Sequence, residues 1–150
     1  MKRLLLLTLL LLSISSSVFA ACHLDESRWK WLFSTDEYGC YYDRNTANIK
    51  SASTFEVWTC NYYPGNTSCN LQPCIDARKS NTEHYHYCNV EFNSERFTIL
   101  FKGIVVRGND GRVVFSANAP SYAQKPDPIT PDSVGEDMML KIKQDLYKYR

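Results

Sequence analysis

The chain has 150 residues, of which 17 are basic and 16 acidic, so its formal net charge is +1. This length is enough for one domain with a single hydrophobic core. The near-neutral balance argues against a nucleic-acid-binding protein, because such proteins carry a basic excess or a basic stripe.

Residues 1–20 are typical of a secretory signal peptide. The basic residues Lys2 and Arg3 precede a leucine-rich run, and a segment of small and polar residues ends at Ala20. The apolar run is shorter than the roughly 20 residues that a membrane-spanning helix needs. We therefore expect cleavage between Ala20 and Ala21, which would leave the mature chain in the periplasm, at the cell surface or in the medium.

All six cysteines follow the expected cleavage site. An exported chain folds where disulfides form and persist. Six cysteines allow many pairings, and the sequence alone does not choose among them. The positions of the cysteines relative to the expected strands and loop favour one tentative set of pairs, namely Cys22–Cys40, Cys60–Cys88 and Cys69–Cys74.

An alternative use of Cys22 comes from residues 19–22, which resemble a bacterial lipobox. There the cysteine is lipidated and becomes the first residue of the mature protein. Phe19 fits that motif poorly, and lipidation of Cys22 would leave five cysteines, an odd number. We therefore expect a cleaved chain without lipid, and membrane association only if Cys22 is lipidated.

Six segments after the cleavage site read as β-strands, because large apolar or aromatic residues alternate in them or turn residues bound them. Their expected ranges are 29–34, 40–43, 55–62, 83–92, 96–106 and 112–116. Turn residues ending at Gly39 predict a hairpin between the first two, and Asn109-Asp110-Gly111 predicts another between the last two. A long loop over 64–82 contains Cys69 and Cys74.

The C-terminal segment predicts one helix. Thr130 suits its N-cap and Pro131 its first position. An apolar stripe follows at helical spacing, comprising Val134, Met138, Ile142, Leu146 and Tyr149. The expected fold class is therefore α+β: an antiparallel meander sheet of about six strands, disulfide-bonded, with one C-terminal helix packed on one face. Residues 21–150 would form this single domain after the signal peptide, 1–20.

The order of several short motifs resembles the bacterial surface-adhesin protein E-like family of small exported envelope proteins. The motifs are Trp29-x-Trp31, Ser34-Thr35-Asp36-x-x-Gly39-x-Tyr41-Tyr42-Asp43, Val57-Trp58, Asp110-Gly111-x-Val113-Val114-Phe115-Ser116 and the run 129–136. The resemblance implies an antiparallel sheet with a C-terminal helix. It also implies adhesin-like binding, since the founding adhesin binds host extracellular-matrix and serum proteins. The cysteine-bearing loop has no expected counterpart in the family.

His84 and His86 form the cluster that most resembles a chemical site. Two residues apart on a strand, both imidazoles would point to the same face. A Cys₂His₂ zinc site with Cys69 and Cys74 is one alternative. The spacing matches no standard zinc site, and an oxidising compartment favours the disulfide, so we expect two half-exposed histidines and no metal.

A small secreted hydrolase is the second alternative. It would use His84 or His86 with a carboxylate such as Glu83 or Glu91. The sequence contains no nucleophile elbow, no His-Glu-x-x-His pair and no phosphate-binding glycine loop. We therefore expect neither catalytic activity nor a cofactor.

Aromatic residues suggest a binding surface. Tyr41, Tyr62, Tyr63 and Tyr85 could stack against a glycan or a protein ligand. The alternative is that they are ordinary strand residues, about half of which alternation would place in the core. We therefore predict a non-catalytic, exported envelope protein that acts by binding a protein or glycan, with an adhesin-like activity as one form of this. Whether it forms a homodimer stays open.

Overall fold

The computed structural model describes residues 24–65 and 82–148. The expected signal peptide and the cysteines Cys22, Cys69 and Cys74 lie outside these ranges. Within them, no helix combines the length and the apolar character needed to cross a membrane.

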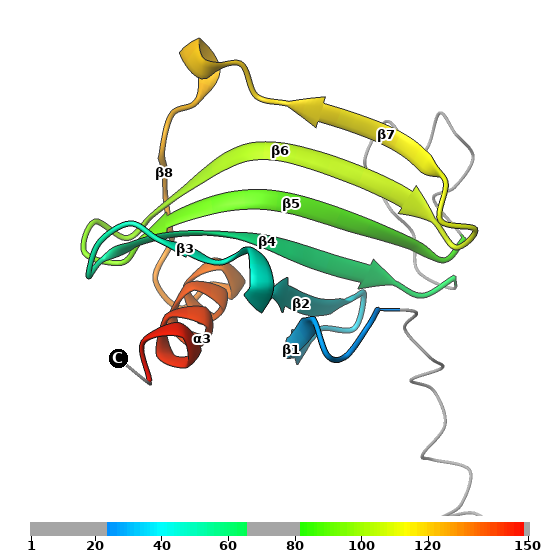
Figure 1. Cartoon of the computed structure of the whole chain (residues 1–150), viewed down its shortest axis with the longest axis horizontal. Helices are drawn as coiled ribbons and strands as arrows, with labels where there is room; N and C mark the ends of the chain where they lie inside the picture. Colours follow the sequence, from blue (N-terminus) through cyan, green and yellow to red (C-terminus); the bar gives the residue numbers. More distant parts are fainter. Residues whose placement is uncertain (1–23, 66–81, 149–150) are drawn as a thin grey trace, which may run out of the picture.

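The described chain forms an antiparallel sheet followed by one helix (Figure 1). The main strand order is β1-β2-β4-β5-β6-β7, so these strands pair in the order in which they follow along the chain. The short β3, which lies between β2 and β4 in sequence, is not part of this order. The main elements are β1 (Trp29–Ser34), β2 (Gly39–Asp43), β4 (Thr54–Tyr63), β5 (His84–Asn93), β6 (Thr98–Gly108), β7 (Val113–Asn118) and the helix α3 (Val134–Tyr147). These findings confirm the predicted antiparallel meander and its C-terminal helix.

Short elements connect and extend the sheet. The 3-10 turn η1 (Arg44–Thr46) and the two-residue strand β3 (Asn48–Ile49) lie between β2 and β4, and β3 pairs with β4. The 3-10 turn η2 (Ser121–Ala123) and the strand β8 (Asp127–Pro128) follow β7, and β8 pairs with β6. The segment from β7 to β8 thereby brings the chain back to the start of α3 (Figure 1).

The sheet has two faces, which we call the helix face and the opposite face. On the helix face, Phe55 and Phe92 are fully buried, and their ring centroids are 5.4 Å apart. Met139 and Ile142 of α3 belong to the same buried cluster. Burial of each such side chain contributes roughly 1.5–3 kcal/mol before entropy is subtracted. The helix lies at the end of the sheet where β4 begins and β5 ends (Figure 1).

The helix begins later than predicted. Ser133 is the N-cap, and its side chain accepts a hydrogen bond from the backbone N–H of Glu136 at 3.3 Å. The residue before it, Asp132, has a left-handed φ of 58° and cannot belong to a right-handed helix. The prediction of Thr130 as N-cap and Pro131 as first helical residue was therefore wrong.

The buried side of α3 also differs from the predicted stripe. Met139 and Ile142 are its buried residues, whereas Val134 is 43% exposed. Met138 and Leu146 are partly buried against the core, and Tyr149 lies outside the described residues. Val134, in the first turn, is not among the helix residues that pack against the core cluster.

The expected bridge between Cys60 and Cys88 was wrong. Cys60 lies opposite Tyr87, and Cys88 lies opposite Thr59. Directly opposed residues share a face, so the two cysteines point to opposite faces of the sheet. Cys40 carries a free, buried thiol in the structure. The expected partner of Cys40, Cys22, and the pair Cys69–Cys74 lie outside the described residues.

Register shifts in three strand pairs, β1–β2, β5–β6 and β6–β7, change which side chains share a face. In β1 the register shifts between Trp31 and Phe33, so Phe33 belongs to the helix-face cluster. In β6, Gly103 lies opposite Asn89 and Phe101 lies opposite Val90, the next residue of β5. Lys102 is therefore the extra residue of a bulge. At Gly103 a Cβ would lie 2.6 Å from Oδ1 of the exposed Asn118, so a larger residue there would require the Asn118 side chain to move.

Candidate functional site

The four tyrosines predicted as a surface do not form one. Tyr62 and Tyr85 are 8% and 5% exposed and belong to a buried cluster on the opposite face, against which the half-buried Tyr41 packs. Tyr63 lies opposite His84 in the ladder and therefore points to the helix face. Alternation along β4 separates the neighbours Tyr62 and Tyr63, so the sheet itself divides the set.

His84 and His86 share the helix face, as predicted, but they are buried rather than half-exposed. The Tyr63 ring stacks on His84 at a centroid distance of 4.8 Å and contacts His86 at 4.5 Å. Burial lowers the pKa of His84, and burial together with the charge of His84 lowers the pKa of His86 to about 4. The two imidazoles are therefore neutral members of an aromatic cluster near pH 7.

The carboxylates considered as partners of these histidines are directed elsewhere. Glu83 accepts a hydrogen bond from the Tyr85 hydroxyl at 2.9 Å. Glu91 lies on the opposite face, where Lys50 and Lys102 bind it. In the parts of the chain that the structure describes, no group of three or more His, Cys, Asp or Glu side chains is arranged to hold a metal ion.

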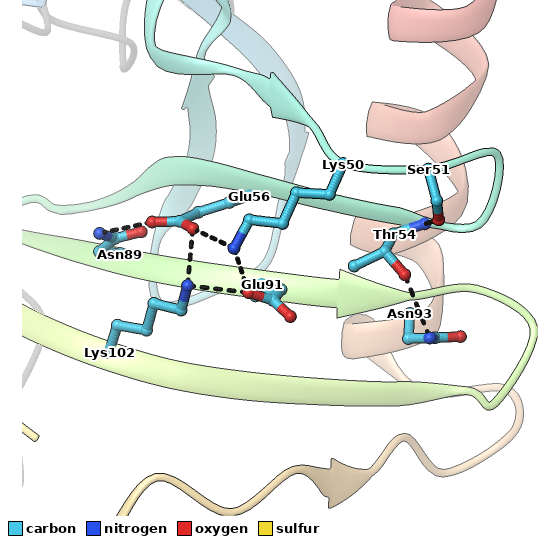
Figure 2. A network of polar contacts seen from close by, with 8 residues as sticks. All are labelled: Lys50, Ser51, Thr54, Glu56, Asn89, Glu91, Asn93 and Lys102. Carbon is cyan, nitrogen blue, oxygen red and sulfur yellow. Dashed lines mark hydrogen bonds and ion pairs between the residues drawn. The ribbon is translucent and has the colours of Figure 1, made fainter. Parts of the chain in front are cut away.

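The opposite face carries a network of four charges, shown in Figure 2. Glu56 and Glu91 are directly opposed on β4 and β5. Lys50 and Lys102 each contact both carboxylates at 2.6–2.8 Å. Although burial raises the pKa of Glu56, hydrogen bonds from Lys102, Lys50 and Asn89 lower it to about 2. Since the charges balance within this network, it presents no net charge to a ligand.

A cavity of about 470 Å³ lies next to this network on the opposite face. We call it the arginine–aromatic cleft. It is lined by Arg28, Trp29, Thr46, Trp58, Tyr87, Val105 and Arg107. Its size falls in the range of small-molecule sites, which pair aromatic side chains with a few polar groups.

Three aromatic rings shape the cleft. Trp58 comes from β4, where it follows Glu56 on the opposite face. Tyr87 comes from β5, where it precedes Asn89 on the same face. Trp29 comes from β1, and its ring centroid is 5.4 Å from that of Tyr87. In the sheet, β2 and β4 lie between β1 and β5, so the rings of Trp29 and Tyr87 meet above these two strands.

Buried polar contacts fix one side of the cleft. Arg28 Nε and Nη2 lie 2.7 Å and 2.6 Å from Oδ2 of Asp43, which is fully buried. The guanidinium carbon of Arg28 lies 5.6 Å from the Trp29 ring centroid, within cation–π range. The Thr46 hydroxyl donates to the main-chain oxygen of Asp43 at 3.0 Å and accepts a hydrogen bond from the backbone N–H of Trp58 at 3.3 Å. Arg28 and Thr46 are thus held in place before any ligand arrives.

Arg107 supplies the uncompensated charge of the cleft. Its Nη1 donates to the Gly111 carbonyl at 2.9 Å, and no carboxylate of the described residues forms an ion pair with it. Arg28, in contrast, is neutralised by Asp43. The cleft therefore offers an anion one available guanidinium beside aromatic rings, a combination that recognises planar or ring-shaped anions.

Sequence analysis did not identify Arg28, Trp58 or Arg107 as site residues, although Trp58 belongs to one of the motifs that carry the family resemblance. Alternation gave part of the information: it places Val105 and Arg107 on the same face of one strand, and it assigns Trp58 and Tyr87 each to one face of its own strand. Only the register of β4, β5 and β6 shows that these residues share a face. The approach of Arg28 and Trp29 depends on the β1–β2 hairpin, which no local pattern places over β5.

Comparisons of the chain with models of protein families, with curated proteins and with solved structures gave no match. The resemblance to the surface-adhesin protein E-like family therefore rests on the short motifs alone and remains a hypothesis.

Proposed function

We propose that this chain is an exported, non-catalytic protein of the cell envelope that binds a ligand in the arginine–aromatic cleft. The observation that carries the proposal is the cleft itself, in which Trp29, Trp58 and Tyr87 lie beside Arg107, a cation without a carboxylate partner among the described residues. Preformed cavities with aromatic walls and a few fixed polar groups are typical binding sites. An adhesin-like activity towards a protein or glycan is the form of binding that the family resemblance suggests.

Two features support binding rather than catalysis. The histidines His84 and His86 are buried in an aromatic cluster on the helix face, away from the cleft. The carboxylate Glu91 is occupied by two lysines on the other face. Neither arrangement provides a base beside a nucleophile, which general acid–base chemistry requires.

Export is the cellular part of the proposal. The motivation is the N-terminal segment 1–20, followed by Ala21. N-terminal sequencing of the protein from fractionated cells should give Ala21 in the periplasm or medium. Recovery of the intact chain from the cytoplasm would contradict export. A bridge between Cys69 and Cys74 belongs to this part, and peptide mapping without reductant should find it.

A binding screen tests the site. The mature protein would be applied to arrays of glycans and of extracellular proteins, together with Trp58→Ala and Phe101→Ala. Phe101 is 50% exposed and lies opposite Val90 on the helix face, so it controls for loss of a surface aromatic ring. Loss of a buried aromatic contact should weaken binding by about 2 kcal/mol, roughly 30-fold. Equal binding by all three proteins would refute the cleft as the site.

A further inference from the structure

A second cavity adjoins the arginine–aromatic cleft. It has a volume of about 540 Å³ and is lined by Glu26, Trp29, Lys30, Trp31 and Tyr41. Trp29 lines both cavities, so its indole is the shared wall between them. Trp31 is 61% exposed, although large aromatic side chains are normally covered. The two cavities together form a groove that exceeds what one small ligand needs.

Charge is distributed unevenly along this groove. The second cavity carries Glu26 and Lys30, whose charges balance. In the first cavity, Asp43 neutralises Arg28, and Arg107 remains uncompensated. An anionic group would therefore be favoured at the Arg107 end, and a neutral ring at the Trp31 end.

The floor of the first cavity disfavours an extended peptide, although β1, which lines the second cavity, is an edge strand of the sheet. Peptides that bind sheets do so mainly by adding a strand to an exposed edge. The floor of the first cavity comes from β4, β5 and β6, each of which is paired on both sides. Recognition there depends on side chains alone, namely on aromatic faces and a guanidinium. A chain of sugar rings matches these groups, because its apolar C–H faces pack on aromatic rings and its acidic substituents bind arginine.

We propose that the two cavities bind one linear acidic polysaccharide, with a carboxylate or sulfate at Arg107 and successive sugar rings against Trp58, Trp29 and Trp31. This inference rests on the proposed function and deepens it, because it names the ligand class of the same cleft. It requires that affinity grow with chain length, since a longer oligomer reaches both cavities.

The test uses the mature protein and four probes: an oligouronate of two sugars, one of six, neutral cellohexaose and oligoglutamate of six residues. Calorimetry or tryptophan fluorescence would give each dissociation constant. We expect the hexauronate to bind at least tenfold more tightly than the diuronate, and at least tenfold more tightly than cellohexaose or hexaglutamate. Equal affinities for hexauronate and hexaglutamate would overturn the choice of a sugar chain.

Matched variants locate the two subsites. Arg107→Gln should abolish the preference for the acidic hexamer, whereas Arg112→Gln should retain it. Arg112 is 87% exposed in the adjacent turn, so it controls for net charge. Trp31→Ala should remove the tenfold gain with chain length and leave diuronate binding unchanged. Equal effects of the two arginine variants, or a gain that survives Trp31→Ala, would overturn the inference.

Failure of the inference differs from failure of the proposed function. If no acidic oligosaccharide binds but the array yields another ligand that Trp58→Ala loses, the cleft is a binding site and only the ligand class is wrong. If every ligand that the wild type binds on the array also binds Trp58→Ala equally well, the cleft is not the binding site. The proposed function is then refuted, and the inference about the groove is refuted with it.

Discussion

Arg28 holds the buried carboxylate of Asp43 through two guanidinium nitrogens that both contact Oδ2, at 2.7 Å and 2.6 Å. Asp43 is fully buried, whereas half of the Arg28 side chain is exposed. The Asp43 Oδ1 accepts the Asn45 N–H at 3.0 Å, so this residue also caps η1. One ion pair therefore joins the turn before β1 to the connection that follows β2.

The first prediction concerns this pair. Arg28→Ala should lower the free energy of unfolding by about 2 kcal/mol, because it leaves the buried Asp43 carboxylate without its charged donor. Arg44→Ala is the matched control, since its pair with Asp145 is exposed and 3.8 Å long. Arg44→Ala should lower the free energy of unfolding by less than about 1 kcal/mol. Urea denaturation at pH 7 measures both, and similar losses would mean that Asp43 does not depend on Arg28.

The second prediction concerns the charge network. Lys102→Met would leave the opposed carboxylates Glu56 and Glu91 with Lys50 alone. We expect a loss of about 1–2 kcal/mol at pH 7. Since the folded pKa of Glu56 is about 2, below its usual value, its stabilising contribution is present above pH 4.5 and is lost as the pH falls towards 2.

The loss caused by Lys102→Met should therefore shrink between pH 7 and pH 3. Lys125→Met, an exposed change of the same kind, should shift stability by less than about 0.5 kcal/mol at either pH. Denaturant titrations at both pH values test this, and a pH-independent effect of Lys102→Met would show that the loss does not come from the ion pairs with Glu56 and Glu91.

The third prediction is a pH dependence from the buried histidines. The folded pKa of His86 is about 4, below the unfolded value near 6.5, because burial disfavours the charged imidazole. The neutral form stabilises the fold fully above pH 6.5, and this contribution is lost as the pH falls through 4. The wild type should lose about 2–3 kcal/mol between pH 7 and pH 4.5.

His86→Gln removes this titration, so its unfolding free energy should vary less over the same interval, even if it is lower at pH 7. Thermal or urea unfolding in steps of half a pH unit gives both slopes. Parallel curves for the two proteins would place the acid sensitivity elsewhere.

The fourth prediction distinguishes the buried side of α3. Met139→Ala should destabilise the protein by about 2–4 kcal/mol, because Met139 is fully buried between helix and sheet. Val134→Ala, at a position 43% exposed, should cost less than about 1 kcal/mol. Comparable losses in unfolding experiments would mean that the helix packs through its first turn, as the sequence stripe had suggested.

Patterns of alternation predicted the strands well, because much of β4 and β5 alternates between buried and partly exposed residues. Glu56, Trp58 and Cys60 share a face as the sequence indicates, and the turn at Asn109–Gly111 forms, with Gly111 at a φ of 75°. The start of α3 was missed because Asp132 is left-handed, a conformation that a good N-terminal pattern at Thr130 does not reveal.

The site was missed for a different reason. Alternation places the neighbours Tyr62 and Tyr63 on opposite faces, but it does not tell which residues of other strands share each face. The cleft assembles residues from β1, η1, β4, β5 and β6, and local sequence does not specify their registers. What decides the site is long-range pairing, including the register shifts that change the face of the following residues.

The bulge at Lys102 gives β6 an unusual spacing. Ile99 and Ile104 are five positions apart, yet both face the helix side of the sheet, whereas an unbroken strand would send them to opposite faces. Deletion of Lys102 would restore a regular ladder with Ile99 still on the helix face, but it would remove the cation that joins Glu56 and Glu91. A relative that keeps the two opposed carboxylates should therefore also keep this extra residue, and the odd interval between apolar positions is a signature by which a distant homologue could be recognised.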